Sequence, residues 1–482
     1  MIFRKLAFRQ TAAAIFFIAA YAHSTGAAAQ NASEASAALP ESSAAPNSPP
    51  SATASASLSA PPAWGLHAQS TYIWQSKPAF SAAYSGPNSL VPGKEKSYSF
   101  TVTGDLGLRL WSGAQLHFNP EAARGEPLSK LTGAGGLSNG ELARGGSSVL
   151  KTYRARLFVQ QRVDAGGPQE AVEAGFNELG GHAAEQRWTF TLGNFALLDF
   201  FDANPYAKDP RTQFMNWAYL TYGAWDYAAD ARGYTMGAVA EYRAPNWALR
   251  AGRAMQPQQS NGLALDRNIG VHYGDQVELE GNLPWAVAAG PLRARALLFS
   301  NRIRAGSFSD ALALGQATNT TPDLGLVRRN QLKTGWGLTL EAPLGEDAGV
   351  FVRASGNNGK LETYAFTEID QQLSLGAQFT GARWGRALDR VGVAYAINGL
   401  SGSHRDYLAA GGLGFFLGDG KLNYGTERVL ETYYSWALPA WRMRAGKLES
   451  AISVGAQFIS NPGYNRDRGP VQTYSVRLHT EF

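Results

Sequence analysis

The stretch SYSFTVTGDLGLRLW, residues 97–111, decides the fold class of this 482-residue chain. Its even positions carry Tyr98, Phe100, Val102, Leu106, Leu108 and Leu110. Its odd positions carry mainly serine and threonine, together with Asp105 and Arg109. Alternation with a period of two predicts a β-strand with one apolar and one polar face, and it argues against an amphipathic helix.

The same alternation recurs along the chain. Comparable segments begin near residues 153, 188, 234, 292, 336, 373, 391 and 452. They are separated by turn sequences such as SGNNGK (355–360) and LGDGK (417–421), which join antiparallel neighbours. We count about sixteen strands from near Leu66 to Phe482, with fourteen or eighteen as the alternatives, because strand boundaries are the least certain part of such a count.

The polar face of these strands indicates a membrane barrel. It carries Arg, Glu, Asp and Thr where the buried face of a soluble sheet would carry Val and Leu. The apolar face must then point outward, and strands of about 10 residues with this inverted pattern are typical of a transmembrane β-barrel. The sequence contains no run of about 18 apolar residues, the length that a membrane-spanning helix needs. We therefore predict an all-β, transmembrane antiparallel barrel with long extracellular loops.

The N-terminal region precedes the barrel. Residues 1–29 combine three basic residues, an apolar core and small residues, which predicts a secretory signal peptide cleaved near Ala29 or Ala22. Residues 30–62 are dominated by Ala, Ser and Pro and contain no aromatic residue, so we expect a disordered linker. Residues 63–482 form the predicted barrel domain. Such a protein is exported, and the barrel places it in a bacterial outer membrane.

Two connections are expected to be the longest, at residues 113–149 and 194–233. The second contains DPRTQFMNWAYL, which we expect either to form a short helix capped at Asp209 or to fold into the lumen.

The chain ends in an alternating strand, QTYSVRLHTEF, whose last residue is Phe482. This segment resembles the terminal strand by which outer-membrane proteins are recognised by their assembly machinery. The alternative is the edge strand of a secreted sandwich.

Several stretches resemble the OprB-type carbohydrate-selective porins. They are STYIWQSKPAFSAAYSGPNSL (70–90), LRLWSGAQLHFNPE (108–121), DPRTQFMNWA (209–218), GAWDYAADARGYTMG (223–237), YAFTEIDQQLSLG (364–376) and NGLSGSHRDYLAAGGLGFFLGDGKLNYGTERVLETYY (398–434). They follow one order across nearly the whole barrel region. The resemblance implies a sixteen-stranded outer-membrane barrel through which sugars diffuse passively into the periplasm, without a cofactor. The implied partners are small sugars, membrane lipid and lipopolysaccharide, and the assembly machinery, with a monomer or a homotrimer both possible.

The polar parity of the strands predicts the residues that line the pore. We expect solute contact from Asp105, Arg109, Arg154, Arg156, Glu278, Glu280, Arg293, Arg295 and Arg353. An Arg fork held against a carboxylate presents several donors in fixed geometry, which suits neutral polyols, and charged side chains are a common form of selectivity filter. For any one arginine, a salt bridge that stiffens the wall is an equally good interpretation. Aromatic residues that are placed to stack on sugar rings are Trp64, Trp74, Phe158 and Trp217.

Other function classes have less support in the sequence than a porin. A net charge of +5 without a basic cluster argues against nucleic-acid binding, and the absence of Cys excludes thiolate metal sites and thiol nucleophiles. The seven His are not at metal-ligand spacing. GLSNG (136–140) matches a nucleophile elbow only by letters, and Ser401, Ser403, His404 and Asp406 are close in sequence but lie in a Gly-rich turn. The open alternatives are an anion-preferring or general porin, favoured by the Arg excess, and a surface adhesin, favoured only by the long loops.

Overall fold

The computed structural model describes residues 62–142, 147–287, 290–443 and 446–482, all within the compact unit Ala60–Phe482. The signal peptide predicted at 1–29 and the linker predicted at 30–62 lie outside the described residues, except for Pro62.

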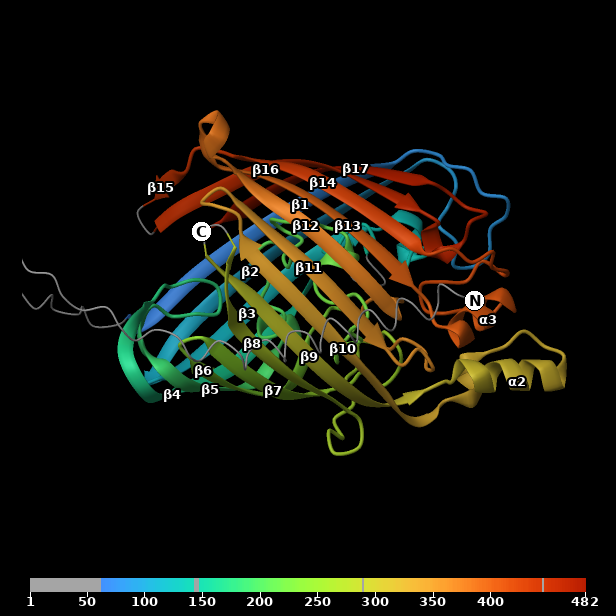
Figure 1. Cartoon of the computed structure of the whole chain (residues 1–482), viewed down its shortest axis with the longest axis horizontal. Helices are drawn as coiled ribbons and strands as arrows, with labels where there is room; N and C mark the ends of the chain where they lie inside the picture. Colours follow the sequence, from blue (N-terminus) through green and yellow to red (C-terminus); the bar gives the residue numbers. More distant parts are fainter. Residues whose placement is uncertain (1–61, 143–146, 288–289, 444–445) are drawn as a thin grey trace, which may run out of the picture. The chain divides into compact units, whose positions relative to one another are not determined.

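The described residues form one antiparallel sheet that closes into a barrel (Figure 1). Its strands are β1 (Trp64–Lys77), β2 (Glu95–Trp111), β3 (Ala114–Glu126), β4 (Lys151–Val172), β5 (Gly181–Phe195), β6 (Thr235–Ala244), β7 (Trp247–Met255), β8 (Tyr273–Val287), β9 (Gly290–Ala305), β10 (Arg329–Pro343), β11 (Ala348–Asn357), β12 (Gln371–Gly381), β13 (Arg386–Gly399), β14 (Glu427–Ala437), β15 (Trp441–Met443), β16 (Gly446–Ser460) and β17 (Val471–Glu481). Sixteen of them form the wall, and the three-residue β15 pairs only with β16. The predicted count of sixteen barrel strands is confirmed.

Pairing of the first and last strands closes the barrel. β1 pairs with β17 in a register that sets Tyr72 opposite Leu478, and it pairs with β2 on its other side. The backbone of Phe482 exchanges two hydrogen bonds with Ala68, of 2.8 and 3.0 Å. The terminal strand therefore leaves no open edge, which a sheet in lipid requires.

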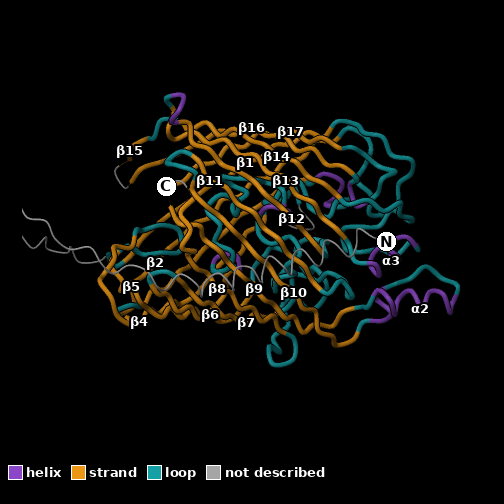
Figure 2. Tube along the Cα trace, in the orientation of Figure 1, coloured by secondary structure: helices purple, strands orange, loops and turns teal. Residues whose placement is uncertain are grey.

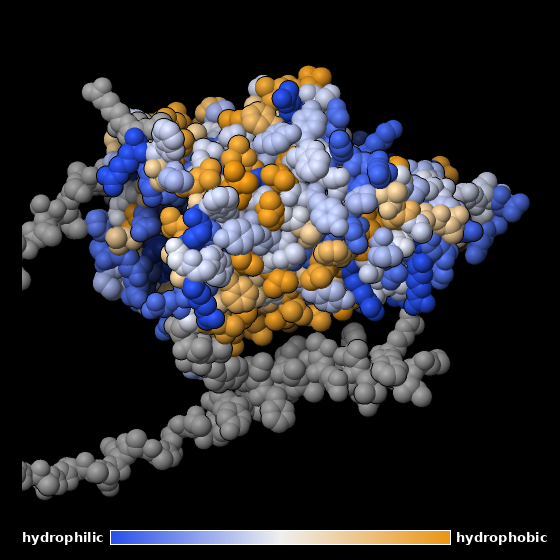
Figure 3. Space-filling view, turned by 90° about the horizontal axis from the view of Figure 1, so that it is seen from above, coloured by the Kyte–Doolittle hydropathy of each residue, from blue (hydrophilic) through white to orange (hydrophobic). Residues whose placement is uncertain are grey.

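The alternation assigns the two faces of the wall as predicted. In β2, Val102 and Leu106 are exposed on the outer face, whereas Thr101, Thr103 and Asp105 are buried inside. Figure 3 shows apolar residues gathered over the middle of the wall, with hydrophilic residues toward both ends. Within the described part of the chain, no helix is both long and apolar enough to cross a membrane.

Turns and loops divide between the two ends of the barrel. One end has short turns, such as residues 112–113 between β2 and β3 and 344–347 between β10 and β11, together with Phe482. The other end has long loops, which in porins face the cell exterior (Figure 2). The loop predicted at 113–149 is wrong in its first part, because β3 occupies Ala114–Glu126. The turn at Ser112 and Gly113 was too short to stand out in the sequence.

The helices of the described residues are short and lie in the connections between strands. They are the α-helices α2 (Phe308–Thr318) and α3 (Gly402–Ala409), and the 3-10 helices η2 (Leu128–Leu131), η3 (Leu197–Asp199), η4 (Trp217–Tyr219), η5 (Leu324–Val327), η6 (Ala382–Trp384) and η7 (Pro462–Tyr464).

The connection between β5 and β6, residues 196–234, folds into the barrel, and we call it the luminal loop. Its Trp217, Tyr219, Tyr222 and Trp225 are all buried. The predicted helix does not begin at Asp209, which starts a turn. The short helix η4 begins at Trp217, eight residues further on, and is capped by the side chain of Asn216. Of the two alternatives for this segment, packing into the lumen is the one observed.

Candidate functional site

Arginines of the barrel wall hold the luminal loop by its carbonyl groups. Arg353 on β11 donates to the carbonyl oxygens of Tyr219 at 2.8 Å and Ala207 at 2.5 Å. Arg477 on β17 donates to those of Pro210 and Gln213, both at 2.7 Å. Both arginine side chains are almost fully buried. These guanidinium groups thus satisfy loop carbonyls that have no strand partner.

Carboxylates of the wall hold the same loop by its amide groups. Glu431 on β14 accepts from the backbone N–H of Met215 at 2.6 Å and of Asn216 at 2.9 Å. Glu278 on β8 accepts from the N–H of Asp202 at 2.7 Å. The wall therefore supplies both donors and acceptors to a loop that lacks regular secondary structure over most of its length, and this fixes the path of the loop through the lumen.

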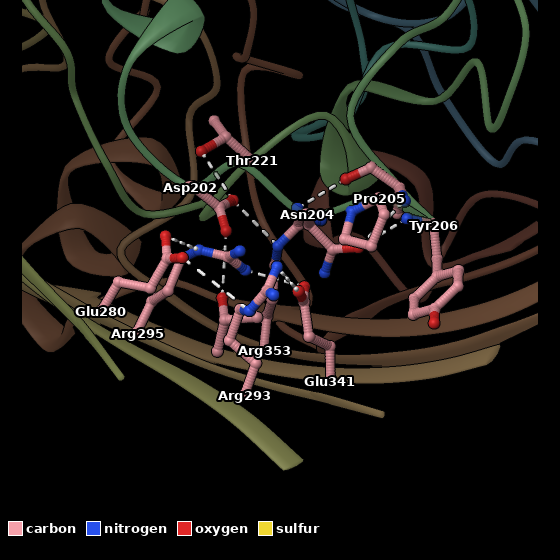
Figure 4. Close-up of polar contacts among 12 residues, drawn as sticks. Asp202, Asn204, Pro205, Tyr206, Thr221, Glu280, Arg293, Arg295, Glu341 and Arg353 are labelled. Carbon is pink, nitrogen blue, oxygen red and sulfur yellow. Dashed lines mark hydrogen bonds and ion pairs between the residues drawn. The ribbon is translucent and has the colours of Figure 1, made fainter. Parts of the chain in front are cut away.

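Asp202 connects the loop to a row of charged side chains on the wall (Figure 4). We call this row the ladder, and it consists of Arg250, Glu278, Glu280, Arg293, Arg295 and Glu341. Its Oδ2 lies 2.9 Å from Nε of Arg353 and accepts from Thr221 at 3.0 Å, while its Oδ1 accepts from Thr339 at 3.1 Å. Asp202 itself is buried. A buried carboxylate is stable when it is paired and hydrogen-bonded in this way.

The ladder continues across β7 to β10. Arg250 contacts Glu278 at 2.9 Å and Glu280 at 2.8 Å, and Arg295 joins Glu280 at 3.0 Å to Glu341 at 2.7 Å. Cations and carboxylates thus alternate along this wall, so each charge is balanced by its neighbours.

A central cavity of about 370 Å³ lies between the luminal loop and the wall of β1 to β4. Both aromatic and charged side chains line it. They include Gln69, Glu121, Tyr153, Arg156, Phe176, Asn177, Lys208, Arg211, Trp217, Arg232, Tyr234 and Phe366. Such a mixture of aromatic faces and a few fixed polar groups is typical of a small-molecule site.

Glu121 on β3 organises the polar part of the central cavity. It accepts hydrogen bonds from the phenol groups of Tyr153 at 2.5 Å and Tyr234 at 3.1 Å, and from Arg211 at 3.1 Å. Arg211 also contacts Glu141 at 2.8 Å. Burial favours the neutral form of Arg211, but Glu141 and Glu121 raise the pKa of its guanidinium above the ordinary value, so it stays charged.

Arg156 on β4 is the other fixed fork in the central cavity. Its guanidinium donates twice to Asp199, at 2.7 Å each, and lies 5.3 Å from the ring centre of Tyr234. Arg232 stacks at 4.1 Å over the ring of Tyr153. Cations over aromatic faces at these distances stabilise both partners.

Lys208 on the luminal loop differs from these arginines, because its ammonium group makes no hydrogen bond or ion pair with the described residues. Burial lowers the pKa of Lys208, although the charges of Asp199, Asp202 and Glu278 oppose this effect. The cavity thus contains a lysine that loses its charge more readily than usual.

Two further cavities lie next to the central one. A vestibule of about 790 Å³ is formed by the long loops, and Ala231 and Asn261 line both it and the central cavity. A cavity of about 380 Å³ near the short turns includes Lys447 and Glu481, and it shares Arg211 with the central cavity. The three cavities follow one another along the lumen.

The predicted pore-lining residues fall in different places. Arg156 lines the central cavity, and the side chain of Arg293 is 41% exposed on the ladder, 3.8 Å from both Glu280 and Glu341. Arg295 and Glu280 belong to the ladder itself, and Glu278 and Arg353 hold the luminal loop. The loop thus covers several wall residues that the strand parity alone would expose to the pore.

The remaining predicted residues lie elsewhere. Asp105 and Arg109 hold the connection between β4 and β5 at the short-turn end. Arg154 is exposed and donates to Asn194 at 3.3 Å, because a bulge between β3 and β4 separates it from the face that carries Arg156. The structure therefore separates two arginines that are neighbours in the sequence pattern.

The aromatic residues that were predicted to stack on sugar rings also lie in different places. Trp217 lines the central cavity and stacks on Phe366, with 5.2 Å between ring centres. Phe158 is buried against His117, Trp64 is exposed at the short-turn end, and Trp74 is half-buried on β1. The sequence did not identify Glu121, Tyr153, Arg211 and Tyr234 as site residues. Arg211 and Tyr234 nevertheless lie in DPRTQFMNWA (209–218) and GAWDYAADARGYTMG (223–237), two of the stretches that resemble the porin family.

The residues weighed as an enzyme site do not form a relay. His404 pairs with Asp370 at 3.1 Å and not with Asp406, and the hydroxyl of Ser401 donates to the carbonyl of Gly359 at 2.5 Å. Among the residues that the structure describes, no cluster of three or more His, Cys, Asp or Glu side chains is suited to a metal ion.

The chain is similar to known outer-membrane porins. Residues 94–482 match a family model described as "Carbohydrate-selective porin, OprB family". A high-pH structure of OprB from Pseudomonas putida superposes with a TM-score of 0.61 at 14% identity, covering 87% of this chain and 94% of that one. OccK2 of Pseudomonas aeruginosa superposes with a TM-score of 0.41 at 10% identity, covering 87% of this chain and 97% of that one. The trimer form of OmpT from Vibrio cholerae superposes with a TM-score of 0.42 at 10% identity, covering 87% of this chain and 99% of that one. No significant match emerged among curated protein sequences.

Proposed function

Because the chain belongs to the OprB family of carbohydrate-selective porins, we propose that neutral sugars cross its lumen through the vestibule, the central cavity and the cavity near the short turns. The protein is a porin of the bacterial outer membrane, and passage is passive diffusion. This function requires no catalytic role for GLSNG (136–140) or for the segment from Ser401 to Asp406.

One observation carries the preference for neutral solutes. The arginines of the ladder, Arg250, Arg295 and Arg293, and those that hold the central cavity, Arg156 and Arg211, all have carboxylate partners within 4 Å. A paired guanidinium still carries N–H groups, but its charge is largely cancelled by the carboxylate. Such pairs offer dense hydrogen bonding to hydroxyl groups without attracting ions strongly.

The central cavity combines these donors with aromatic faces. A pyranose ring has C–H groups that pack on rings such as Trp217 and Tyr234, while its hydroxyls meet Glu121, Arg156 and Arg211. Rapid passage requires that these contacts attract the sugar and yet release it, so several moderate contacts serve better than one strong site.

Liposome swelling tests this proposal directly. Vesicles that contain the purified protein should swell faster in mono- and disaccharides than in amino acids or gluconate of similar size. Sugar added to planar bilayers should interrupt the ion current. Equal swelling in all solutes would support a general porin, and no swelling would support an adhesin or a structural barrel.

An anion-preferring pore is the second candidate. Lys208 and Arg232 line the central cavity, and neither side chain forms an ion pair with the described residues. Two uncompensated cations at a narrow level attract anions and raise their local concentration. Reversal potentials across a salt gradient decide between the candidates, since a strong anion preference would contradict the neutral-sugar assignment.

We also propose roles for residues 1–62 and a set of partners for the protein. Export of an outer-membrane protein fits the signal peptide at 1–29, followed by the linker at 30–62. The apolar wall suits membrane lipid and lipopolysaccharide, and the closing strand β17, followed by Phe482, fits recognition by the assembly machinery. A monomer and a homotrimer remain the two candidate states, and crosslinking in membranes distinguishes them.

A further inference from the structure

The connection between β4 and β5, residues 173–180, turns back under the barrel wall at the short-turn end, and we call it the periplasmic tongue. Asp105 on β2 accepts from the backbone N–H of Asn177 at 2.8 Å. Arg109, on the same strand, donates to the carbonyl oxygen of Gly180 at 2.9 Å. Two residues predicted to line the pore are thus used to hold this segment.

The periplasmic tongue is also held by its own side chains. Glu178 forms an ion pair with Arg162 and accepts from Gln115 at 3.1 Å, and the N–H of Leu179 donates to Gln115 at 2.9 Å. Leu179 is buried over Gly107, where an added Cβ would lie 2.9 Å from its Cδ2. Because side chains from β2, β3 and β4 hold it, the tongue is a fixed part of the lumen.

The tip of the tongue reaches the central cavity. Phe176 and Asn177 line that cavity together with Gln69, which β1 places at the short-turn end opposite Glu481. Phe176 is half-buried, with its ring centre 6.1 Å from that of His67. Asn177 adopts a left-handed backbone with φ of 62°. That conformation is uncommon outside glycine but accessible to Asn, and it turns the chain back toward the wall.

Asn177 carries a buried polar atom without a partner. Its Oδ1 accepts no hydrogen bond in the structure, whereas its backbone N–H is bound to Asp105. A buried carbonyl oxygen without a donor is unfavourable, and native proteins rarely leave one unpaired. A hydroxyl group of a solute in the cavity is a donor of the required kind, and it reaches this covered oxygen when the side-chain amide turns toward the cavity.

We propose that the periplasmic tongue forms a carbohydrate-contact site, the exit site, on the periplasmic side of the central cavity, with Phe176 as a stacking surface and Asn177 as the hydrogen-bonding group. This inference rests on the proposed sugar transport. A sugar that leaves the polar cluster at Glu121 meets an aromatic ring and an amide before it enters the periplasm. The exit site lowers the free energy of a sugar bound there and so lengthens the time that the sugar spends in the cavity before release.

Sugar block of the ion current in planar bilayers tests this site. Phe176→Met keeps a side chain of similar length without the ring, and we expect block by a disaccharide to weaken about 3- to 10-fold at nearly unchanged conductance. Phe176→Tyr keeps the ring, so the disaccharide should block its ion current as strongly as that of the unsubstituted protein. Asn177→Gly, which removes the amide and keeps the left-handed backbone, should weaken block by a similar factor. Glu173→Ala, at an exposed position of the same tongue, is the matched control and should change nothing.

The outcomes separate the two proposals. If the unsubstituted protein shows sugar block and Phe176→Met retains it in full, the exit site is wrong while the sugar pore stands. If Phe176→Met raises conductance without changing block, the tongue acts only as a steric restriction and the proposal is also overturned. Absence of block in the unsubstituted protein contradicts the proposed function itself. Circular dichroism and heat-modifiable migration confirm that each variant has folded.

Discussion

Nε of Arg353 lies 2.9 Å from Oδ2 of Asp202, and both side chains are fully buried between the barrel wall and the luminal loop. The two N–H groups at the other end of the guanidinium bind the carbonyls of Tyr219 and Ala207. One wall side chain therefore fixes three separate points of the loop that narrows the lumen.

Arg353→Met should release the luminal loop. The substitution leaves Asp202 buried without its cation, and breaking one partner of a buried pair costs about 3–5 kcal/mol. We expect higher and noisier single-channel conductance, together with tryptic cleavage at Lys208 and Arg211. Arg293→Met is the matched control, because Arg293 is partly exposed and lies 3.8 Å from its carboxylates. A quiet channel of ordinary conductance in Arg353→Met would contradict this role.

Arg156 and Arg154 should differ in their effect on sugars. Arg156→Ala removes a fork of the central cavity, and sugar block should become about 10- to 100-fold weaker, because a hydrogen bond from a charged group contributes about 1.5–3 kcal/mol. Arg154→Ala serves as control, since that side chain is exposed and does not line the central cavity. Titration of current block with a disaccharide measures both variants. Equal loss in the two would show that both arginines contact the sugar.

Glu121→Gln should shift ion selectivity toward anions. The substitution removes one negative charge from the central cavity while keeping the acceptor for Tyr153 and Tyr234, and it leaves Arg211 with only Glu141. Reversal potentials in a tenfold salt gradient report the shift. Glu126→Gln, at the exposed end of the same strand, should leave the potential unchanged.

Lys208 should make ion selectivity depend on pH in the alkaline range. Burial lowers its pKa, so the ammonium group is charged below that value and becomes neutral as the pH rises through it, while still under the ordinary lysine range. Anion permeability should therefore fall with rising pH earlier than for an exposed lysine. Lys208→Gln should remove this step, and Lys208→Arg should keep the anion permeability of the charged form throughout. A step that persists in Lys208→Gln would belong to another group.

The sequence by itself determined the barrel. Period-two alternation, turn sequences and a closing terminal strand are local properties, and in lipid only a closed sheet satisfies every backbone group of such strands. It also identified residues 209–218 and 223–237, which supply Arg211, Trp217 and Tyr234 to the central cavity. The barrel follows from the chain and its solvent alone, whereas these two stretches were identified by their resemblance to the OprB-type porins.

Only the tertiary structure decided which polar residues line the central cavity. Strand parity assigns Arg353, Glu278 and Arg156 to the same inner face, yet the luminal loop covers the first two and leaves the third beside the cavity. Likewise, the periplasmic tongue occupies Asp105 and Arg109. The path of a loop depends on hydrogen bonds between residues that are 71 to 134 positions apart in these examples, and a pattern that repeats every two residues contains no information about them.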